Sequence, residues 1–314
     1  MRQILVLAGG LSHEREVSLR SGRRVADALA GSGYEADVRD VDATLLAAVK
    51  SSCPDVIWPL LHGASGEDGA LRDVLGALGI PYVGSRPPSC RLTWDKPVAK
   101  ALVGAAGLST PAGMALSHAT FRELGAPALL ESVIDALGLP LAVKPSRGGS
   151  SLGLTIVRTA PELPSAMITA YAYGDIALLE QFIEGTEVAV SIVEDAQGEA
   201  HVLPAVEIVP DGGVYNYEAR YTAGSTEFFT PARLSSSAAA SAASVSLTAY
   251  RTLGHQHLSR VDLIVDSDER PWFLEANVSP GMTETSLLPM AVQAAGLKPS
   301  DVYGAIVERA LSTT

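Results

Sequence analysis

The chain has 314 residues, of which 47% are hydrophobic and 18% charged, and its formal net charge is −12. This length suits two or three domains with a sizeable core, and the acidic balance argues against nucleic acid or an anionic membrane as a partner. No apolar run in the sequence is long enough to span a membrane.

The amino terminus and the cysteines both favour a cytoplasmic protein. The stretch MRQILVLAGG has an apolar run too short for a signal peptide and lacks a small-residue cleavage site, so it reads as a first buried strand. Cys53 and Cys90 have no metal-type spacing, and we expect them to be incidental thiols in a reducing compartment.

Residues 1–92 alternate strand-like and helix-like stretches, which predicts an open α/β domain. Ligands of such sheets bind beyond the carboxyl ends of the strands. Those ends carry Gly9-Gly10 followed by Glu16, and His62 followed by an acidic loop. The glycine pair does not form GxGxxG, so no dinucleotide site follows from it. Taken alone, Glu16 reads as an ordinary helix-face charge and His62 as a polar loop residue.

The region from residue 93 onward holds the stretch best suited to bind phosphate. A helical pattern carries Lys96 and Lys100, and a predicted strand delivers Lys144 to the loop SRGGSSLG. Backbone N–H groups of such a loop can close on phosphate oxygens, and lysine adds a point charge. It is not a Walker A loop, because the lysine precedes the glycines. The alternatives are surface lysines and a flexible Ser/Gly linker.

Two further stretches indicate a hinge and a lid. ALLEQFIEGTEVAVSIV predicts one strand that ends around residues 180–183, a turn, and a second strand that begins near Glu187. Residues 210–230 lack a clear period and carry three tyrosines, which predicts a long loop of the kind that often acts as a lid.

The stretch RVDLIVDSDERPWFLEAN predicts a β-hairpin with one polar face. If the turn is centred between residues 268 and 269, Asp262 lies opposite Glu275. Arg260 then lies opposite Asn277. Residues two apart share a face of a strand, so all four polar side chains point the same way, unless a turn of odd length shifts the register.

This polar face is a candidate metal site. Two carboxylates opposed across neighbouring strands repel each other unless a cation lies between them. With the amide oxygen of Asn277, Asp262 and Glu275 make an oxygen-only ligand set, which suits a hard cation such as Mg²⁺. The alternative is a solvated sheet face with scattered charges.

With the hairpin in place, the sequence resembles a known family. The hairpin followed by SPGMTETSLLPM, the early stretch HEREVSLRSG and the loop LHGASGEDG are similar to signatures of D-alanine–D-alanine ligases, in the ATP-grasp superfamily. The resemblance covers nearly the whole chain. It implies an α/β fold, α+β in the carboxyl-terminal half, with an amino-terminal substrate-side domain (1–92) and two ATP-grasp subdomains (93–183 and 184–314) that enclose ATP. The last subdomain would carry a lid at about 210–230.

The resemblance also implies an activity. Members of this family join two D-alanines into D-alanyl-D-alanine for peptidoglycan precursors. ATP phosphorylates the carboxylate of the first D-alanine, and the amine of the second attacks the acyl phosphate. The implied cofactors are ATP, as a co-substrate, and two Mg²⁺ ions, for which Mn²⁺ can substitute. The implied assembly is a cytoplasmic homodimer.

By resemblance, one group of residues binds the nucleotide and its metal ions. The phosphate contacts are Lys96 and Lys144, with Arg220 reaching the γ-phosphate from the lid. The hinge that holds adenine and ribose consists of Glu180, Phe182, Ile183 and Glu187. The metal ligands are Asp262, Glu275 and Asn277.

A second group, again by resemblance, binds the amino acids. Arg260 and the N–H of Gly281 stabilise the oxyanion that forms when the amine attacks. The contacts to the two D-alanines come from His62, Ser286 and Leu287. A hydrogen-bonded triad that ties the lid to the first substrate consists of Glu16, Ser150 and Tyr221, and this tyrosine favours amide formation with D-alanine.

Two positions depart from the family pattern. Arg220 stands where lysine is usual, and arginine keeps the charge but has a planar fork and a different reach. Gly148 stands where an acidic residue is common. These differences leave room for a related ATP-grasp ligase or cyclase that uses another amino acid, in antibiotic biosynthesis or self-resistance. An alternative of another class is a nucleotide-binding sensor without catalysis, against which the metal ligands and Arg260 argue.

Overall fold

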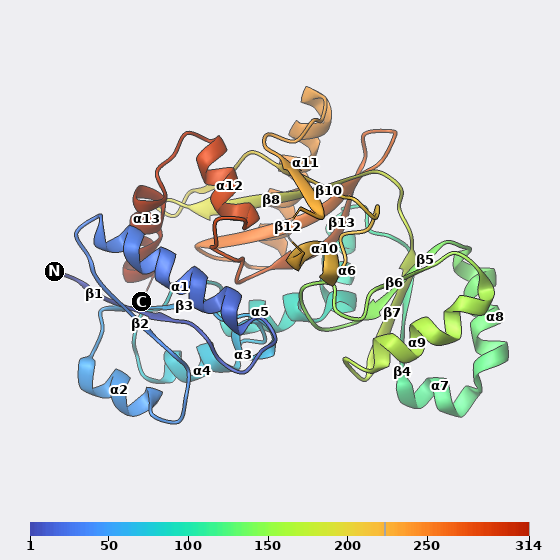
Figure 1. Ribbon diagram of the computed structural model, residues 1–314, viewed down its shortest axis with the longest axis horizontal. Helices are drawn as coiled ribbons and strands as arrows, with labels where there is room; N and C mark the ends of the chain where they lie inside the picture. The colour runs from blue at the N-terminus through green and yellow to red at the C-terminus, as the bar shows by residue number, and fades with distance from the viewer. Residues whose placement is uncertain (223, 314) are drawn as a thin grey trace.

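The computed structural model describes residues 1–222 and 224–313, apart from the side chain of Tyr221, and within these ranges the strands form three β-sheets. The first sheet belongs to the amino-terminal part, the second to a central lobe, and the third, largest sheet to the carboxyl-terminal part (Figure 1). This arrangement agrees with an ATP-grasp fold of mixed α/β and α+β character.

The amino-terminal part is a small parallel α/β unit. Its sheet has the order β2-β1-β3. Ile4 to Leu7 are all buried, as expected of a central parallel strand that is covered on both faces. The strands are β1 (Gln3–Leu7), β2 (Glu35–Arg39) and β3 (Val56–Pro59), and the helices are α1 (Arg15–Ala30), α2 (Leu45–Ser52), α3 (Ala64–Glu67) and α4 (Ala70–Ala77).

The central lobe has an antiparallel sheet of order β4-β7-β5-β6 and a hydrophobic core of its own. It stands at the right of Figure 1, away from the other two parts. The strands are β4 (Gly113–Ser117), β5 (Leu141–Pro145), β6 (Thr155–Val157) and β7 (Ile176–Gln181), and the helices are α7 (His118–Leu124), α8 (Ala126–Leu137), η1 (Ala160–Glu162) and α9 (Leu163–Tyr171).

Two helices lead from the amino-terminal part to the central lobe, α5 (Pro87–Trp94) and α6 (Lys96–Ala105). Ala99 and Val103 on α6 belong to the same buried cluster as Val261 and Phe273 of the carboxyl-terminal sheet. Helix α6, which the predicted boundaries group with the central subdomain, therefore packs on the carboxyl-terminal one. The boundaries themselves stay predictions.

The carboxyl-terminal sheet has the order β11-β10-β8-β12-β13, with β9 paired to β8. Its strands are β8 (Thr186–Glu194), β9 (Ala200–Val202), β10 (Val206–Pro210), β11 (Thr226–Phe229), β12 (Leu258–Val265) and β13 (Pro271–Asn277). Its helices are α10 (Tyr217–Tyr221), α11 (Ser236–Thr252), α12 (Leu287–Ala294) and α13 (Pro299–Ser312). The predicted lid is thus not loop throughout, because it contains α10 and its last residues form β11, which pairs with β10.

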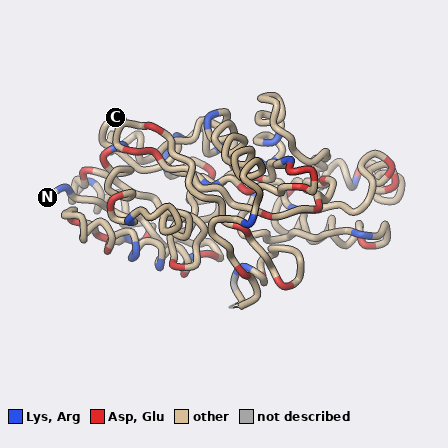
Figure 2. Tube along the Cα trace, turned by 90° about the horizontal axis from the view of Figure 1, so that it is seen from above, with Lys and Arg blue, Asp and Glu red and all other residues tan. Residues whose placement is uncertain are grey.

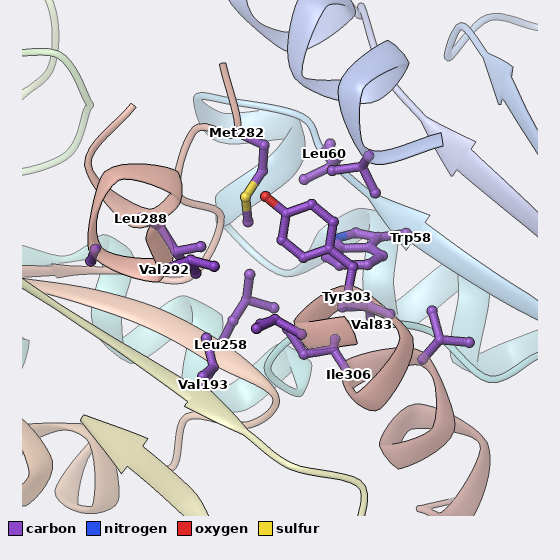
Figure 3. Close-up of a cluster of buried hydrophobic side chains, with 14 of the residues drawn as sticks. Trp58, Leu60, Val83, Val193, Leu258, Met282, Leu288, Val292, Tyr303 and Ile306 are labelled. Carbon is purple, nitrogen blue, oxygen red and sulfur yellow. The ribbon is translucent and has the colours of Figure 1, made fainter. Parts of the chain in front are cut away.

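The amino- and carboxyl-terminal parts share one hydrophobic core, shown in Figure 3. The ring of Trp58, at the end of β3, meets the ring of Tyr303 on α13 edge-on, with centroids 5.6 Å apart. Leu60 packs into the same cluster as Leu258 on β12. Burial of this apolar surface therefore fixes the first sheet against the third, whereas the central lobe is held by a separate core.

No helix within the described ranges is long and apolar enough to cross a membrane. Figure 2 shows acidic and basic residues interspersed along the trace, from the amino-terminal part to the central lobe.

The shared core makes a prediction about stability. Leu60→Ala should lower the free energy of unfolding by about 2–5 kcal/mol, because it removes buried methyl groups and leaves a cavity. The matched change Leu46→Ala, at a side chain that is 44% exposed against 1% for Leu60, should change it by less than about 0.5 kcal/mol. Urea unfolding followed by circular dichroism measures both variants, and equal effects would show that the two parts do not depend on this contact.

Candidate active site

The predicted register of the hairpin is confirmed. Asp262 pairs with Glu275, and Arg260 pairs with Asn277. The loop between the strands nevertheless has an odd length: Val265 pairs with Pro271, which leaves residues 266–270 outside the ladder. A β-bulge restores the register, because the pairing shifts by one residue at Leu274.

The bulge also separates two side chains that a regular strand would place on one face. Phe273 packs in the buried cluster between the sheet and α11, whereas Glu275 lines the cavities on the other side. On β12 the alternation is regular. Leu258 belongs to the shared core, and Arg260 and Asp262 continue the same face into the site.

Cations balance the two opposed carboxylates. Arg260 donates to both oxygens of Asp262, at 2.7 Å from Nε and 2.8 Å from Nη2. Nζ of Lys96 lies 3.3 Å from a carboxylate oxygen of Glu275. Burial alone would raise the pKa of Glu275, but the charges of Lys96, Lys144, Arg220 and Arg260 outweigh it and hold that pKa at about 2. Glu275 is therefore ionised at neutral pH.

The donor chemistry of this face fits a hard cation. Its two carboxylates and the Asn277 amide are all oxygen ligands on paired residues. In the described part of the chain, no three Asp, Glu, His or Cys side chains gather closely enough to hold a metal by themselves. A cation here would therefore need the amide oxygen, which in the structure accepts the N–H of Ser279 at 2.7 Å.

A first cavity, of about 540 Å³, lies between the central lobe and the carboxyl-terminal sheet. The glycine-rich loop 146–153 forms one wall. All the residues predicted to bind nucleotide line it, together with two of the three predicted metal ligands: Lys96, Lys144, Glu180, Phe182, Ile183, Glu187, Arg220, Asp262 and Glu275. Burial raises the pKa of Glu187 to about 7.

The base of this cavity holds a buried ionic cluster that includes one residue not among the predicted site residues. Glu180 is 2% exposed, and one of its oxygens lies 2.5 Å from Nζ of Lys144. The other oxygen lies 3.0 Å from Nζ of Lys100. Lys100 follows Lys96 by four residues on a helix, so both lie on one face. That spacing is the sequence signal that could have identified it.

A second cavity, of about 520 Å³, lies between the amino-terminal part and the carboxyl-terminal sheet. It brings together most of the residues predicted to bind the amino acids: His62, Ser150, Arg260, Gly281, Ser286 and Leu287. The third predicted metal ligand, Asn277, also lines it. The two cavities share a wall, and the residues common to both are Lys96, Gly148, Gly149, Tyr215, Arg220 and Glu275. A group that moves from one cavity to the other would pass between Lys96, Arg220 and Glu275.

The prediction for Glu16 is wrong in one respect: the hydroxyl of Ser150 donates to Glu14, at 2.5 Å. Glu14 lies directly before the first residue of α1 and lines the second cavity. Glu16 lies in the first turn of the helix and is exposed. Consecutive helical residues are about 100° apart, so two positions change the direction of a side chain by more than half a turn. The stretch HEREVS offered both glutamates, and only the start of the helix distinguishes them.

The third member of the predicted triad, Tyr221, is the last residue of α10, and its side chain lies outside the described part of the structure. The lid around it contacts the glycine-rich loop. Ser151 donates its hydroxyl to the carbonyl of Tyr215 at 2.9 Å and accepts from Nε of Arg220 at 3.3 Å. The guanidinium of Arg220 also lies over the ring of Tyr215, 4.1 Å from its centroid. The planar fork of arginine makes both contacts at once, which a lysine could not do.

His62 and Glu67 bring two titratable groups to the second cavity. Nε2 of His62 is buried and has no hydrogen-bond partner among the described residues, and burial lowers the pKa of this imidazole. Burial raises the pKa of Glu67 to about 8, and this carboxyl accepts the N–H of Gly63 at 2.8 Å. A neutral imidazole with an unused nitrogen is therefore available to a polar ligand.

The loop 279–286 is held in place by α1. Ser21 accepts the N–H of Met282 at 3.0 Å, and Nε of Arg24 donates to the carbonyl of Met282 at 3.2 Å. A Cβ atom at Gly281 would lie 2.7 Å from Oγ of Ser286, so a larger residue here would displace that hydroxyl. Helix α12 begins at Leu287, and the residues at its start, Ser286 and Leu287, line the cavity, where a helix amino terminus suits an anion.

Comparison with known proteins agrees with this geometry. Residues 102–308 match the protein-family model for the D-ala D-ala ligase C-terminus. The D-alanine–D-alanine ligase of Bordetella petrii is 42% identical over 305 residues, which cover 97% of this chain and 91% of that protein.

Two solved structures are similar over almost their whole length. The D-alanine–D-alanine ligase from Bacillus anthracis complexed with ATP has a TM-score of 0.83 at 30% identity, and the match covers 100% of this chain and 98% of that one. The VanG D-Ala:D-Ser ligase from Enterococcus faecalis has a TM-score of 0.85 at 28% identity, covering 98% and 99%. The chain therefore belongs to the D-alanine–D-alanine ligase family, with the ATP-grasp fold.

Proposed function

We propose that this protein joins two molecules of D-alanine into D-alanyl-D-alanine, with cleavage of ATP to ADP and phosphate, for peptidoglycan precursors. The observation that carries the proposal is the wall of cationic and acidic side chains shared by the two cavities. A nucleotide in the first cavity and an amino acid carboxylate in the second would meet at this wall. The relative complexed with ATP supports the assignment of the first cavity to that nucleotide.

The first step forms an acyl phosphate. A carboxylate oxygen of the first D-alanine attacks the γ-phosphorus, and the bond to the bridging oxygen of ADP breaks. Lys96 and Arg220 lie where they can neutralise the phosphoryl charge, and Lys144 would hold the phosphates that remain on ADP. When bound, Mg²⁺ neutralises phosphate charge, and Asp262, Glu275 and Asn277 would hold it. Glu14 and Ser150 would bind the amino group of the first substrate from the opposite side.

The second step forms the amide bond. The uncharged amine of the second D-alanine attacks the acyl carbon, the amine loses a proton, and phosphate leaves. Arg260 and Gly281 both line the second cavity, and the guanidinium of Arg260 and the N–H of Gly281 would stabilise the oxyanion that develops. The carboxylate of the second D-alanine suits the start of α12, at Ser286 and Leu287.

A second candidate function differs only in the second amino acid. Arg220 replaces the usual lysine and contacts the lid and the glycine-rich loop together, and a similar fold serves a D-Ala:D-Ser ligase. D-Serine is therefore the alternative acceptor. Either activity suits a cytoplasmic enzyme, where ATP is available, and we propose the homodimer that the resemblance implies.

The experiment that tests the function measures phosphate release from ATP with single amino acids and with pairs. We expect release with D-alanine and Mg²⁺, and D-alanyl-D-alanine as the product by mass spectrometry. The panel contains D-alanine, D-serine, D-lactate and the L-amino acids. Release that requires D-serine would favour the alternative acceptor, and binding of ATP without release under any condition would favour the non-catalytic sensor.

The metal ligands make a separate prediction. Glu275→Ala and Asn277→Ala should each lower the rate of phosphate release by at least about 100-fold, because each removes an oxygen that holds the charge-neutralising cation. Raising the Mg²⁺ concentration should recover part of the lost rate. The control is Glu131→Ala, at an exposed glutamate on α8. A wild-type rate in either site variant, at saturating ATP and Mg²⁺, would remove the metal from this face.

The roles of Glu14 and Glu16, at the start of α1, can be distinguished by making the same substitution at each. Glu14→Gln should lower kcat/KM for D-alanine by about 10- to 100-fold, because the hydroxyl of Ser150 and the substrate amine lose a charged partner. Glu16→Gln should stay within about twofold of wild type, as expected of an exposed charge. Ser150→Ala should lower kcat/KM for D-alanine less in the Glu14→Gln background than in the wild type, since the two side chains act together. Additive losses, or a larger effect at Glu16, would contradict the contact.

A further inference from the structure

The buried ionic cluster below the first cavity consists of Lys100 on α6, Glu180 on β7 and Lys144 on β5. Lys144 and Glu180 line the cavity, whereas Lys100 lies behind Glu180 and does not reach it. Nζ of Lys100 also donates to the carbonyl of Phe273 on β13 at 3.2 Å. Lys100 is 7% exposed, so its ammonium is positioned by contacts with β7 and β13 and by its own helix rather than by water.

The charge of this cluster depends on Lys100. Glu180 lies closer to Lys144, at 2.5 Å, than to Lys100, at 3.0 Å. A carboxylate paired with one ammonium would cancel most of the charge that Lys144 offers to a phosphate. The second ammonium leaves the cluster with a net charge of one positive unit. Because dielectric screening is low in a buried site, this unit of charge strongly changes the electrostatic potential in the cavity.

We propose that Lys100 is a positioning residue of the nucleotide site: it pairs with Glu180 from behind, so that the positive charge of Lys144 stays available to the phosphates. The proposal rests on the nucleotide assignment made under the proposed function and adds the residue that sets the strength of that binding. Lys100 touches neither the nucleotide nor the reacting atoms. It acts through Glu180 and Lys144.

A purely structural role is the weaker explanation. Buried ion pairs contribute little net stability, because removing charges from water offsets most of their attraction. The main effect of the Lys100 charge is therefore on the binding of an anionic ligand in the cavity above it.

The surroundings of Lys100 predict how this effect changes with pH. The charged groups that face it are Glu180 on β7, Lys144 on β5 and Glu275 on β13, with Lys96 one turn earlier on α6. Burial lowers the pKa of Lys100 to about 8, against the attraction of Glu180. Lys144, closer to Glu180, has its pKa raised despite burial. As pH rises from 7 to 9, Lys100 loses its proton first, and the cluster loses its net charge.

The experiment measures binding of ADP with Mg²⁺ by calorimetry at pH 7 and pH 9. ADP carries the phosphates assigned to Lys144 and needs no amino acid or turnover. Wild type should bind ADP several-fold more weakly at pH 9. Lys100→Met should bind about tenfold more weakly than wild type at pH 7 and should change little between the two pH values. Lys100→Arg keeps the charge, and it should bind like wild type at pH 7 and lose the pH dependence. Lys50→Met, at an exposed lysine on α2, is the matched control.

Turnover separates the charge from a structural defect. In Lys100→Met the KM for ATP should rise while the KM for D-alanine stays unchanged, and Lys100→Gln serves as a second neutral variant if the methionine variant does not fold. Equal ADP binding in wild type and a folded neutral variant would overturn the inference alone. A parallel loss of ATP and D-alanine binding, not restored by arginine, would also overturn it. No ADP binding in wild type would overturn the proposed function together with the inference.

Discussion

Two carboxylates that face each other across β12 and β13, Asp262 buried and Glu275 partly buried, are the constraint on which the rest of the site depends. They cannot lie together without positive charge, and the chain brings it from separate elements. Arg260 is supplied by the same strand as Asp262, and Lys96 by the start of α6. Lys96 also donates to the carbonyl of Gly148, at 2.6 Å. The balance of charge at the hairpin therefore also holds the glycine-rich loop near it.

The division of the hydrophobic core explains where the cavities lie. The amino- and carboxyl-terminal parts are fixed to each other by the cluster around Trp58 and Tyr303. The cavity proposed for the amino acids lies between these two fixed parts. The cavity proposed for nucleotide lies between the carboxyl-terminal sheet and the central lobe, whose core is separate. A boundary between separately packed cores is where one part can move against another, so the wall made by the central lobe is the one suited to close on a ligand.

The sequence predicted the parts of the site that follow from periodicity and composition. Alternation along VDLIVD and WFLEAN predicted the pairing of Asp262 with Glu275, and the serine- and glycine-rich loop predicted a wall of the first cavity. It did not predict the bulge at Leu274, because a bulge depends on which residues the core accepts on the far side of the sheet. The prediction assigned to Glu16 the contact with Ser150 that Glu14 makes, because the start of a helix is the least certain part of its sequence pattern. The four-residue spacing placed Lys100 on the same helix face as Lys96, but its partners on β7 and β13 are brought together only by the folded chain.

The bulge at Leu274 has a consequence for how the hairpin can vary. The one extra residue on β13 leaves Phe273 in the core and Glu275 in the site. Removing the extra residue from β13 would turn either Phe273 or Glu275 to the wrong side of the sheet. A loop of another length that leaves Val265 paired with Pro271 would keep both side chains on their sides. The pairing of Asp262 with Glu275 thus depends on the bulge. Grafting this ligand set onto another hairpin requires the bulge as well as the three side chains.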